Sequence, residues 1–327
     1  MEIIDSIETY KPQPAAVTVG VFDGLHLGHQ ALLRELVAEA HARNLISVVV
    51  TFEPHPRIVL SKGNDRVGLI TSTAEKAALI EQCGIDRLVV IPFTRQFSDL
   101  TARQFINNWL KVRLDAKFVL LGYNHHFGSD DVAADDYISL IESEGISARR
   151  SSAFSLPGGT KVSSTEIRNA LETGNIEQAA LLLGHFYPIS GNVVHGDAIG
   201  RQMGFPTANI VADDENKLIP KDGVYAGWVI LEADEQNEQS QPFEAVVNIG
   251  SRPTIGGDGQ RIEAHIIGFQ ADVYNRRATI YLATRMRDEQ KFNGTDDLGL
   301  HIAADVEKAK NILSHLAIKP LRLKSRK

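Results

Sequence analysis

Short apolar runs alternate with amphipathic stretches through the first half of the chain. The runs are rich in β-branched residues, which is typical of strands that are buried on both faces. Between them, apolar residues recur every three or four positions, which predicts helices with one buried face. The expected strands are 17–22, 47–52, 87–91, 117–122 and 147–150, and the expected helices are 29–43, 74–83, 101–114 and 136–144. This alternation predicts an α/β fold with a parallel sheet, in which ligands bind beyond the carboxyl ends of the strands.

The pattern changes in the second half, where short β-type runs are separated by glycine and proline. These runs, at 189–195, 207–211, 224–231, 243–249, 261–267 and 278–283, predict a small antiparallel β-barrel. The polar stretch 232–241 predicts a hairpin loop. A final amphipathic helix is expected over 296–316, capped by Thr295 and packed on the barrel. A short helix over 175–183 closes the first half, so the expected domains are 1–184 and 185–327.

The composition is that of an ordinary globular protein, with 43% hydrophobic and 23% charged residues. The net charge of −7 argues against a large nucleic-acid interface. Cys83 is the only cysteine, so no disulfide can form within the chain, which fits a reducing cytosol. The first residues lack the blocks of a signal peptide, and no apolar run is long enough to cross a bilayer. We therefore expect a cytoplasmic monomer or weak oligomer that acts on small molecules and binds neither nucleic acid nor membranes.

His26 and His29 stand where the first expected strand gives way to a helix. Gly24 and Gly28 allow unusual backbone angles or a close backbone approach in this turn. The N-terminus of a helix presents free N–H groups and a positive dipole end, so it is a ready site for an anion. Two histidines could also bind a metal, but nothing near them in the sequence supplies a third ligand. The residues alone leave phosphate binding and an ordinary surface role equally open.

Three other segments follow expected strands and carry polar residues. His55 lies between two prolines in a stiff loop, which a structural turn explains as well. Asn124 belongs to the loop that follows the strand 117–122. The hydroxyl residues 163–165 precede a helix, and a role as helix cap accounts for them.

In the second half, Gly196, Gly200 and Gly204 recur every four residues. A loop that folds its backbone N–H groups over phosphates would explain this spacing, and so would a glycine-rich hairpin connection. The Walker pattern Gly-x-x-x-x-Gly-Lys-Ser/Thr is absent, which excludes a P-loop kinase. Glu263 and His265 share one face of the strand expected there, and an exposed strand explains them equally well.

Two strings carry a resemblance to a known family. Residues 20–29, Gly-Val-Phe-Asp-Gly-Leu-His-Leu-Gly-His, resemble the flavin-specific form of the nucleotidylyltransferase signature. Residues 204–209, Gly-Phe-Pro-Thr-Ala-Asn, resemble the riboflavin kinase signature. Further motifs follow in family order over about 17–316, so the chain resembles the bacterial bifunctional riboflavin kinase/FAD synthetase family. The resemblance implies a Rossmann-like nucleotidylyltransferase domain and a riboflavin kinase-like barrel, which make FMN from riboflavin and then FAD from FMN with ATP and Mg²⁺.

For the first domain, the resemblance implies that FMN attacks the α-phosphorus of ATP and that His26, His29 and Arg168 carry the catalysis. Because the nucleophile is already an anion, the protein has only to position and neutralise charge. Flavin binding is implied for His55 and Pro56. Nucleotide binding is implied for Gly20, Phe22, Asp23, Gly24, Gly28, Asn124, Ser163, Ser164 and Thr165.

For the second domain, the resemblance implies that Glu263 accepts the 5′-hydroxyl proton as riboflavin attacks the γ-phosphorus. Thr207 and Asn209 are implied as Mg²⁺ ligands, since both offer the oxygen that a hard cation requires. The remaining implied residues are Gly200, Gly204 and Pro206 at the nucleotide and Arg287, Glu289 and Phe292 at the flavin.

The sequence departs from the family pattern near Asn124. His125 replaces a usual aromatic residue, and Ala133 and Ala134 lie where glycine is expected. An enzyme with only one live activity, with the adenylyltransferase at risk, is therefore one alternative. A flavin-binding or flavin-sensing protein that does no chemistry is the other.

Overall fold

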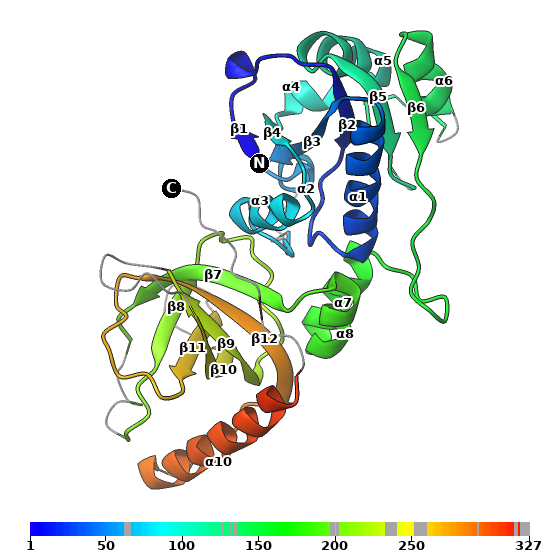
Figure 1. Ribbon diagram of the computed structural model, residues 1–327. Coiled ribbons are helices and arrows are strands. Elements are labelled where there is room, and N and C mark those ends of the chain that lie inside the picture. The colour runs from blue at the N-terminus through cyan, green and yellow to red at the C-terminus, as the bar shows by residue number, and fades with distance from the viewer. Residues whose placement is uncertain are drawn as a thin grey trace. The chain divides into compact units, whose positions relative to one another are not determined.

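The structure is a computed structural model of the whole chain (Figure 1). It describes residues 1–61, 67–123, 125, 127–130, 132–133, 136–196, 200, 203–232, 241–251, 260–292, 294–316 and 320. The chain forms two compact units, of which the first contains Met1–Val67 and Lys76–Val162. The second contains Gly68–Glu75 and Ser163–Lys327. The domain boundary predicted between residues 184 and 185 stays a prediction.

The first unit is built on a parallel sheet of six strands in the order β1-β4-β3-β2-β5-β6. From β2 the chain moves outward to β3 and β4 on one side and to β5 and β6 on the other. The order therefore reverses at β2, and ligands of such sheets bind at this reversal. The strands are β1 (Glu2–Ile4), β2 (Ala15–Val19), β3 (Ile46–Glu53), β4 (Arg87–Pro92), β5 (Ala116–Leu121) and β6 (Ser147–Arg150).

Helices follow most of these strands along the chain. A π-helical stretch, η2 (Ile106–Arg113), continues α5, and η1 (Ile7–Thr9) is a short 3-10 turn. One helix, α3, begins with residues of the second unit and continues from Lys76 in the first. The helices are α1 (Leu27–Ala42), α2 (Pro56–Leu60), α3 (Thr73–Gln82), α4 (Arg95–Ser98), α5 (Ala102–Phe105) and α6 (Asp136–Ser143).

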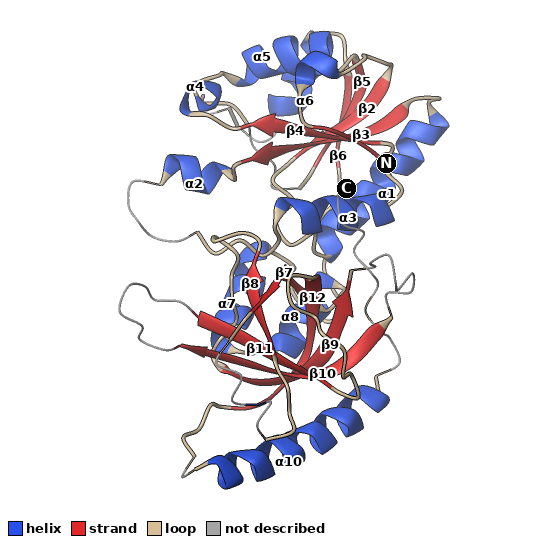
Figure 2. Cartoon of the chain, turned by 90° about the vertical axis from the view of Figure 1, so that its left-hand side faces the viewer, coloured by secondary structure: helices blue, strands red, loops and turns tan. Residues whose placement is uncertain are grey.

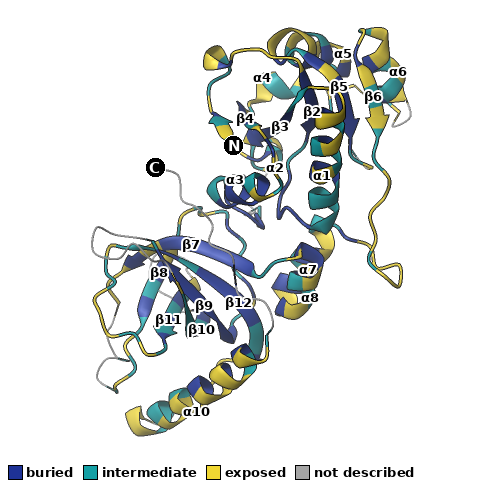
Figure 3. Ribbon diagram, in the orientation of Figure 1, coloured by how far each residue is buried: buried dark blue, intermediate teal, exposed yellow. Residues whose placement is uncertain are grey.

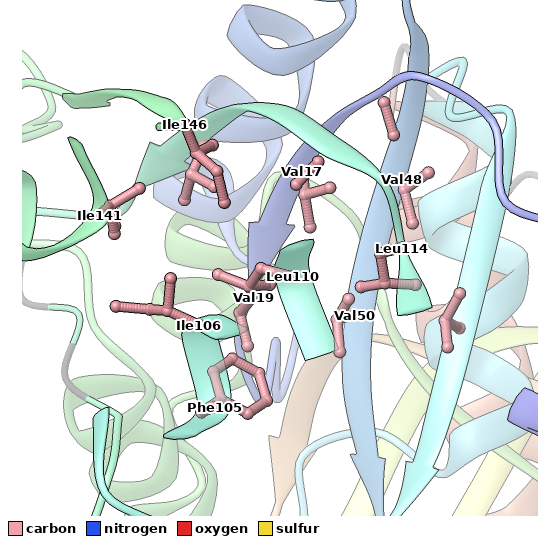
Figure 4. Close-up of a cluster of buried hydrophobic side chains, with 14 of the residues drawn as sticks. Val17, Val19, Val48, Val50, Phe105, Ile106, Leu110, Leu114, Ile141 and Ile146 are labelled. Carbon is pink, nitrogen blue, oxygen red and sulfur yellow. The ribbon is translucent and has the colours of Figure 1, made fainter. Parts of the chain in front are cut away.

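The core of the first unit explains why β2 is apolar throughout. All its residues are buried, and Figure 4 shows Val17 and Val19 on the face that meets Phe105 and Leu110. On α1, the residues Leu32, Leu33, Leu36 and Ala40 are buried, and this helix packs on β2 and β3. A strand that is covered on both sides is held in one register, because slipping by one residue would exchange its two buried faces.

The second unit contains a closed antiparallel barrel in the order β10-β11-β8-β7-β12-β9 (Figure 2). Two short helices, α7 (Ser164–Thr173) and α8 (Ile176–Leu183), precede it. The long helix α10 (Thr295–Ser314) follows it, with one buried and one exposed face (Figure 3). The barrel strands are β7 (Tyr187–Val194), β8 (Ala208–Ala212), β9 (Gly223–Leu231), β10 (Pro242–Ser251), β11 (Gln260–Ile266) and β12 (Arg277–Arg287).

The outer face of the barrel is apolar where α10 covers it. Trp228, which is 1% exposed, and Val246 belong to the same buried cluster as Val306, Ala309 and Leu313 of α10. Burying an aromatic of this size stabilises the fold by about 1.5–3 kcal/mol. The predicted barrel and the predicted packing of its last helix are both confirmed.

A buried ion pair joins the segment Gly68–Glu75 to the barrel within the second unit. The Nζ atom of Lys217 lies 2.6 Å from Oε2 of Glu75 and donates to the carbonyl of Ile70 at 2.7 Å. The backbone N–H of Ser190 on β7 donates to the other carboxylate oxygen of Glu75 at 2.9 Å. With both charges paired and hydrogen-bonded, this buried pair is satisfied.

Several predicted boundaries were wrong. The strand expected over 17–22 ends at Val19, because Phe22 takes a positive φ of 51° that no strand contains. The first helix begins at Leu27 rather than His29, and the last helix is capped at Gly294 rather than Thr295. The helix expected over 101–114 is α5 continued as π-helix. The hairpin loop predicted over 232–241 lies, apart from its two end residues, outside the described residues.

Candidate active sites

The loop that follows β2 is held in an unusual conformation. Phe22 and Leu25 have φ angles of 51° and 38°, in the left-handed region that side chains rarely adopt, and Gly24 has 84°. Phe22 is 3% exposed and Leu25 is 1% exposed, so packing fixes the loop. Such backbone strain clusters at ligand-binding sites. The loop contains Gly20, Phe22, Asp23 and Gly24 and leads into α1.

His26 caps α1, and its Nδ1 accepts a hydrogen bond from the backbone N–H of His29 at 3.2 Å. In the neutral ring this bond leaves the proton on Nε2. The two imidazoles stack with their centroids 3.6 Å apart. A Cβ atom on Gly28 would lie 3.2 Å from Cε1 of His26, so any side chain there would press on the stacked pair. The structure thus brings Gly28 and both histidines together at the helix N-terminus.

Both histidines are uncharged near neutral pH. Burial lowers the pKa of His26 to about 4. Burial also lowers the pKa of His29 well below its usual value, and repulsion by protonated His26 and by Lys76 lowers it further. Nδ1 of His29 is buried and has no hydrogen-bond partner among the described residues, which is the state of a polar atom that a ligand would satisfy. The pair therefore offers hydrogen bonds to an anion, while its predicted role in catalysis stays a prediction.

Of the other residues predicted for the first domain, His55 and Pro56 begin α2, and Asn124 lies outside the described residues. His55, which is 8% exposed, caps α2, and its Nδ1 accepts from the backbone N–H of Arg57 at 3.0 Å. Pro56 is the first residue of that helix, where its missing N–H costs nothing.

Three further predicted residues begin α7 in the second unit. Ser163 is the N-cap, and its hydroxyl accepts from the backbone N–H of Glu166 at 3.3 Å. Ser164 and Thr165 form the first turn. Arg168, one turn later, donates from Nε to the carbonyl of Gly68 at 2.8 Å. Their joint action with His26 and His29 stays a prediction.

In the barrel, strand pairing aligns Glu263 with two asparagines. Glu263 on β11 is directly opposite Asn209 on β8 and Asn248 on β10. Residues that face each other across antiparallel strands point to the same side of the sheet. Asn248 also donates from Nδ2 to Oε1 of Glu289 at 3.0 Å. Strand pairing therefore places the predicted residues Asn209 and Glu263 in one row with Asn248, and a hydrogen bond connects the predicted Glu289 to Asn248.

A cavity of about 740 Å³ is lined in part by residues of β8 and β11. Gly204, Pro206 and Thr207 line it, together with His265, the neighbour of Glu263 on the same face of β11. The ring nitrogen Nδ1 of His265 lies 2.9 Å from the carbonyl oxygen of Pro206 and holds that loop on the strand. The carbonyl of Gly200 accepts from the backbone N–H of Phe205 at 2.9 Å, which closes the same loop.

Gly196 shows why this loop needs glycine. A Cβ atom there would lie 2.1 Å from Nδ2 of Asn209, so a side chain at this position would have to displace the amide group of Asn209.

Arg287 fastens α10 to β12. Its guanidinium donates from Nε to both carboxylate oxygens of Asp305 at 3.1 Å and from Nη2 to Oδ2 at 2.7 Å. It also lies 5.8 Å from the ring centroid of Phe292. These contacts place Arg287 and Phe292 side by side, with the Arg287 guanidinium held by Asp305. Their predicted contact with the flavin stays a prediction.

Comparison with known proteins identifies both halves of the chain. A family model described as FAD synthetase matches residues 8–166, and one described as riboflavin kinase matches residues 183–313. The bifunctional riboflavin kinase/FMN adenylyltransferase of Escherichia coli K12 is 36% identical over 311 residues, which cover 93% of this chain and 96% of that protein. The chain belongs to the bifunctional riboflavin kinase/FMN adenylyltransferase family.

Other members of this bifunctional family match over similar lengths. The protein of Pseudomonas fluorescens is 33% identical over 314 residues, covering 95% of this chain and 97% of its own. A crystal structure named as a macrolide-efflux protein from Streptococcus pneumoniae matches with a TM-score of 0.84 and 33% identity, covering 94% of this chain and 98% of that one. In the described part of this chain, no helix has the length and apolar content needed to cross a membrane. The family predicted from the sequence motifs is confirmed.

Sequence reasoning gave no role to three features of this family member. Lys76 was placed inside an expected helix, and nothing local indicates that it lies near His29. Asn248 joins the Glu263 row only through strand pairing. Phe52, Phe93 and Phe97 form an aromatic cluster, with ring centroids 5.5–5.7 Å apart, at the carboxyl ends of β3 and β4. Phe52 near the end of β3 and Phe93 directly after β4 were the available signal for this cluster.

Proposed function

We propose that this protein phosphorylates riboflavin to FMN in the barrel and adenylylates FMN to FAD in the parallel-sheet unit, with ATP as donor in both reactions. The observation that carries the proposal is the match to bifunctional relatives over nearly the whole of both chains. The stacked histidines at the N-terminus of α1 support the adenylyltransferase activity. The row of Asn209, Glu263 and Asn248 in the barrel supports the kinase activity.

In the adenylyl transfer, a phosphate oxygen of FMN forms a bond to the α-phosphorus of ATP, and the bond from that phosphorus to pyrophosphate breaks. No proton has to move, so no general base is required. The Nε2 proton of His26, the His29 ring and the free N–H groups of α1 hold phosphate oxygens. The family signature implies that Arg168 and the hydroxyls of 163–165 also hold phosphate groups of ATP. The flat face of FMN packs near His55, Pro56 and the cluster of Phe52, Phe93 and Phe97.

In the kinase reaction, the 5′-hydroxyl oxygen of riboflavin forms a bond to the γ-phosphorus of ATP, and the bond to the departing ADP breaks. Glu263 takes the hydroxyl proton, and Asn248 orients Glu289 beside it. The cavity lined by Gly204, Pro206 and Thr207 takes the nucleotide. Arg287 and Phe292 border the flavin.

The donor set of the barrel fits Mg²⁺. Thr207 and Asn209 offer two neutral oxygen ligands, and Asn209 is directly opposite Glu263. Among the described residues, no group of three His, Cys, Asp or Glu side chains could hold a metal ion. Magnesium commonly takes only one or two protein ligands and completes its shell with substrate phosphates and water. When bound there, the ion would neutralise charge on the phosphates of ATP.

We further propose that the substrates are the small molecules riboflavin, FMN and ATP, that the protein works in the cytoplasm, and that it is a monomer or a weak oligomer. The net charge of −7 and the single cysteine support a cytoplasmic enzyme with no nucleic-acid partner.

Product analysis by chromatography tests the proposal. The protein is mixed with ATP and Mg²⁺ and with either riboflavin or FMN. The expected result is FMN followed by FAD from riboflavin, and FAD and pyrophosphate from FMN. Riboflavin that stops at FMN would overturn the adenylyltransferase half. Tightly bound flavin without any ATP turnover would overturn both halves and indicate a flavin-binding protein.

A further inference from the structure

Lys76 is a buried lysine in the first unit that neither reaction described above uses. The residue is 4% exposed and lies in the first turn of α3. Its Nζ lies 3.4 Å from the hydroxyl oxygen of Thr51, near the carboxyl end of β3. The Thr51 hydroxyl in turn donates to the carbonyl of Val21 at 3.2 Å. Lys76 is thereby tied to the loop that carries His26 and leads into α1.

Two physical rules make this position costly for a lysine. The first turn of a helix carries the positive end of the helix dipole, which disfavours a cation. A charged group also loses hydration when it is buried. Residues that break local rules in this way are expected at functional sites. A buried lysine at this position is therefore a candidate for a role at the neighbouring site.

The charge of Lys76 acts on the pKa of His29, one of the two stacked histidines. Together with burial and the charge of His26, it lowers the pKa of His29. A cation that repels a proton from His29 attracts an anion to the same place, and the low dielectric of a buried site strengthens both effects. The histidines, which are neutral, supply hydrogen bonds, while Lys76 supplies charge.

We propose that Lys76 is a positioning residue for adenylyl transfer, whose fixed positive charge behind the Gly20–His26 loop favours the binding and reaction of phosphate groups held by His26 and His29. This inference rests on the proposed function of that loop. Lys76 neither gives nor takes a proton in this step, since the bond that forms and the bond that breaks both lie between phosphorus and oxygen and no proton moves.

The test compares Lys76→Met, which removes the charge at similar length, with Lys76→Arg, which keeps it. Both are made in the full chain, and FAD formation from FMN is measured separately from FMN formation from riboflavin. We expect Lys76→Met to lower kcat/KM for ATP in adenylyl transfer by about tenfold or more, and Lys76→Arg to retain most of it. The control is Lys117→Met, which removes an exposed lysine paired with Asp115.

Histidine NMR gives a readout that a purely structural role of Lys76 would not move. In Lys76→Met, His29 is expected to take up its proton at a higher pH than in the unmodified protein, and in Lys76→Arg it is not. The kinase rate of each variant reports on folding of the rest of the chain. If Lys76→Met is poorly folded, Lys76→Gln takes its place as the uncharged variant. It is then compared with Lys76→Arg by the same rate measurements and the same NMR titration.

Adenylyl transfer by Lys76→Met or Lys76→Gln within about twofold of the unmodified protein would overturn the inference, and so would an equal loss in Lys76→Arg. Failure of the unmodified protein to make FAD from FMN would instead overturn the proposed function of the first unit. The two failures are therefore distinguishable.

Discussion

The two candidate sites present groups to phosphate in different ways. In the first unit, a strained loop and a helix N-terminus hold two neutral imidazoles, the buried His26 and the partly buried His29, after a strand of the parallel sheet. In the barrel, half-buried polar side chains stand on neighbouring antiparallel strands, and strand register alone aligns them. The first site depends on local backbone geometry and burial, whereas the second depends on pairing between distant segments.

This difference between the two sites indicates which kinds of substitution should abolish the activity of each. A loop site loses function when packing or the field around it changes, because its groups are tuned by burial. A strand-borne site loses function when one chemical group is removed, because the register of the barrel survives the substitution. Substitutions confined to one unit should therefore separate the two activities.

The largest effect is expected for Glu263→Gln, which removes the proton acceptor of the kinase reaction. FMN formation should fall by about a hundredfold to ten-thousandfold, while FAD formation from added FMN stays unchanged. Glu244→Gln on the neighbouring strand β10 is the matched control and should affect neither rate. Chromatography with riboflavin or with FMN as substrate measures both. Loss of both activities in Glu263→Gln would contradict the division of labour between the units.

The reciprocal change is His29→Asn, which removes one of the stacked rings. FAD formation should fall by about a hundredfold, because hydrogen bonds that stabilise developing charge typically contribute this much, and the kinase rate should persist. His41→Asn, in the exposed last turn of α1, is the control and should leave both rates unaltered. Equal activity of His29→Asn and His41→Asn would show that the stacked pair does not serve the reaction.

Lys217→Met is expected to produce the largest loss of stability in the second unit. It leaves the Glu75 carboxylate buried without its partner, which costs about 3–5 kcal/mol in the free energy of unfolding. Lys117→Met, which breaks an exposed pair, should cost less than about 1 kcal/mol. Urea unfolding in a Trp109→Phe background measures the effect, since Trp228 is then the only tryptophan and lies in the barrel. Similar losses of unfolding free energy in Lys217→Met and Lys117→Met would contradict a buried ion pair between Lys217 and Glu75.

The smallest expected effect concerns His26 and pH. Its folded pKa of about 4 lies below the ordinary value of 6.5, so between these values the unfolded chain binds more protons than the folded one. The resulting stability is fully present above about pH 6.5 and is lost as the pH falls toward 4. This difference between the folded and the unfolded pKa of His26 corresponds to about 3 kcal/mol in the free energy of unfolding. His26→Asn keeps a good N-cap but cannot titrate, so its unfolding free energy should fall less over this range. If the unfolding free energies of the unmodified protein and of His26→Asn fell equally over this pH range, the assignment of His26 as a buried, neutral group would be wrong.

Much of the fold followed from local patterns along the chain. Alternating apolar runs and amphipathic stretches predicted the parallel sheet, and short runs split by glycine and proline predicted the barrel, because periodicity reflects which faces are buried. The site motifs were found for the same reason, since glycines and histidines cluster where a strand gives way to a helix. Asn124, however, lies outside the described residues, so its predicted role was not examined by the structure.

The sequence by itself determined the order of the elements, the family and the places where chemistry is concentrated. Only the tertiary structure decided which of these places meet and what state their groups take. Pairing of β8, β10 and β11 put Asn209, Glu263 and Asn248 in one row, and burial made His26 and His29 neutral. Lys76 came close to Thr51, 25 positions earlier, only through folding. The physical reason is that periodicity is a local property, whereas strand register, burial and electric field depend on residues far apart in the chain.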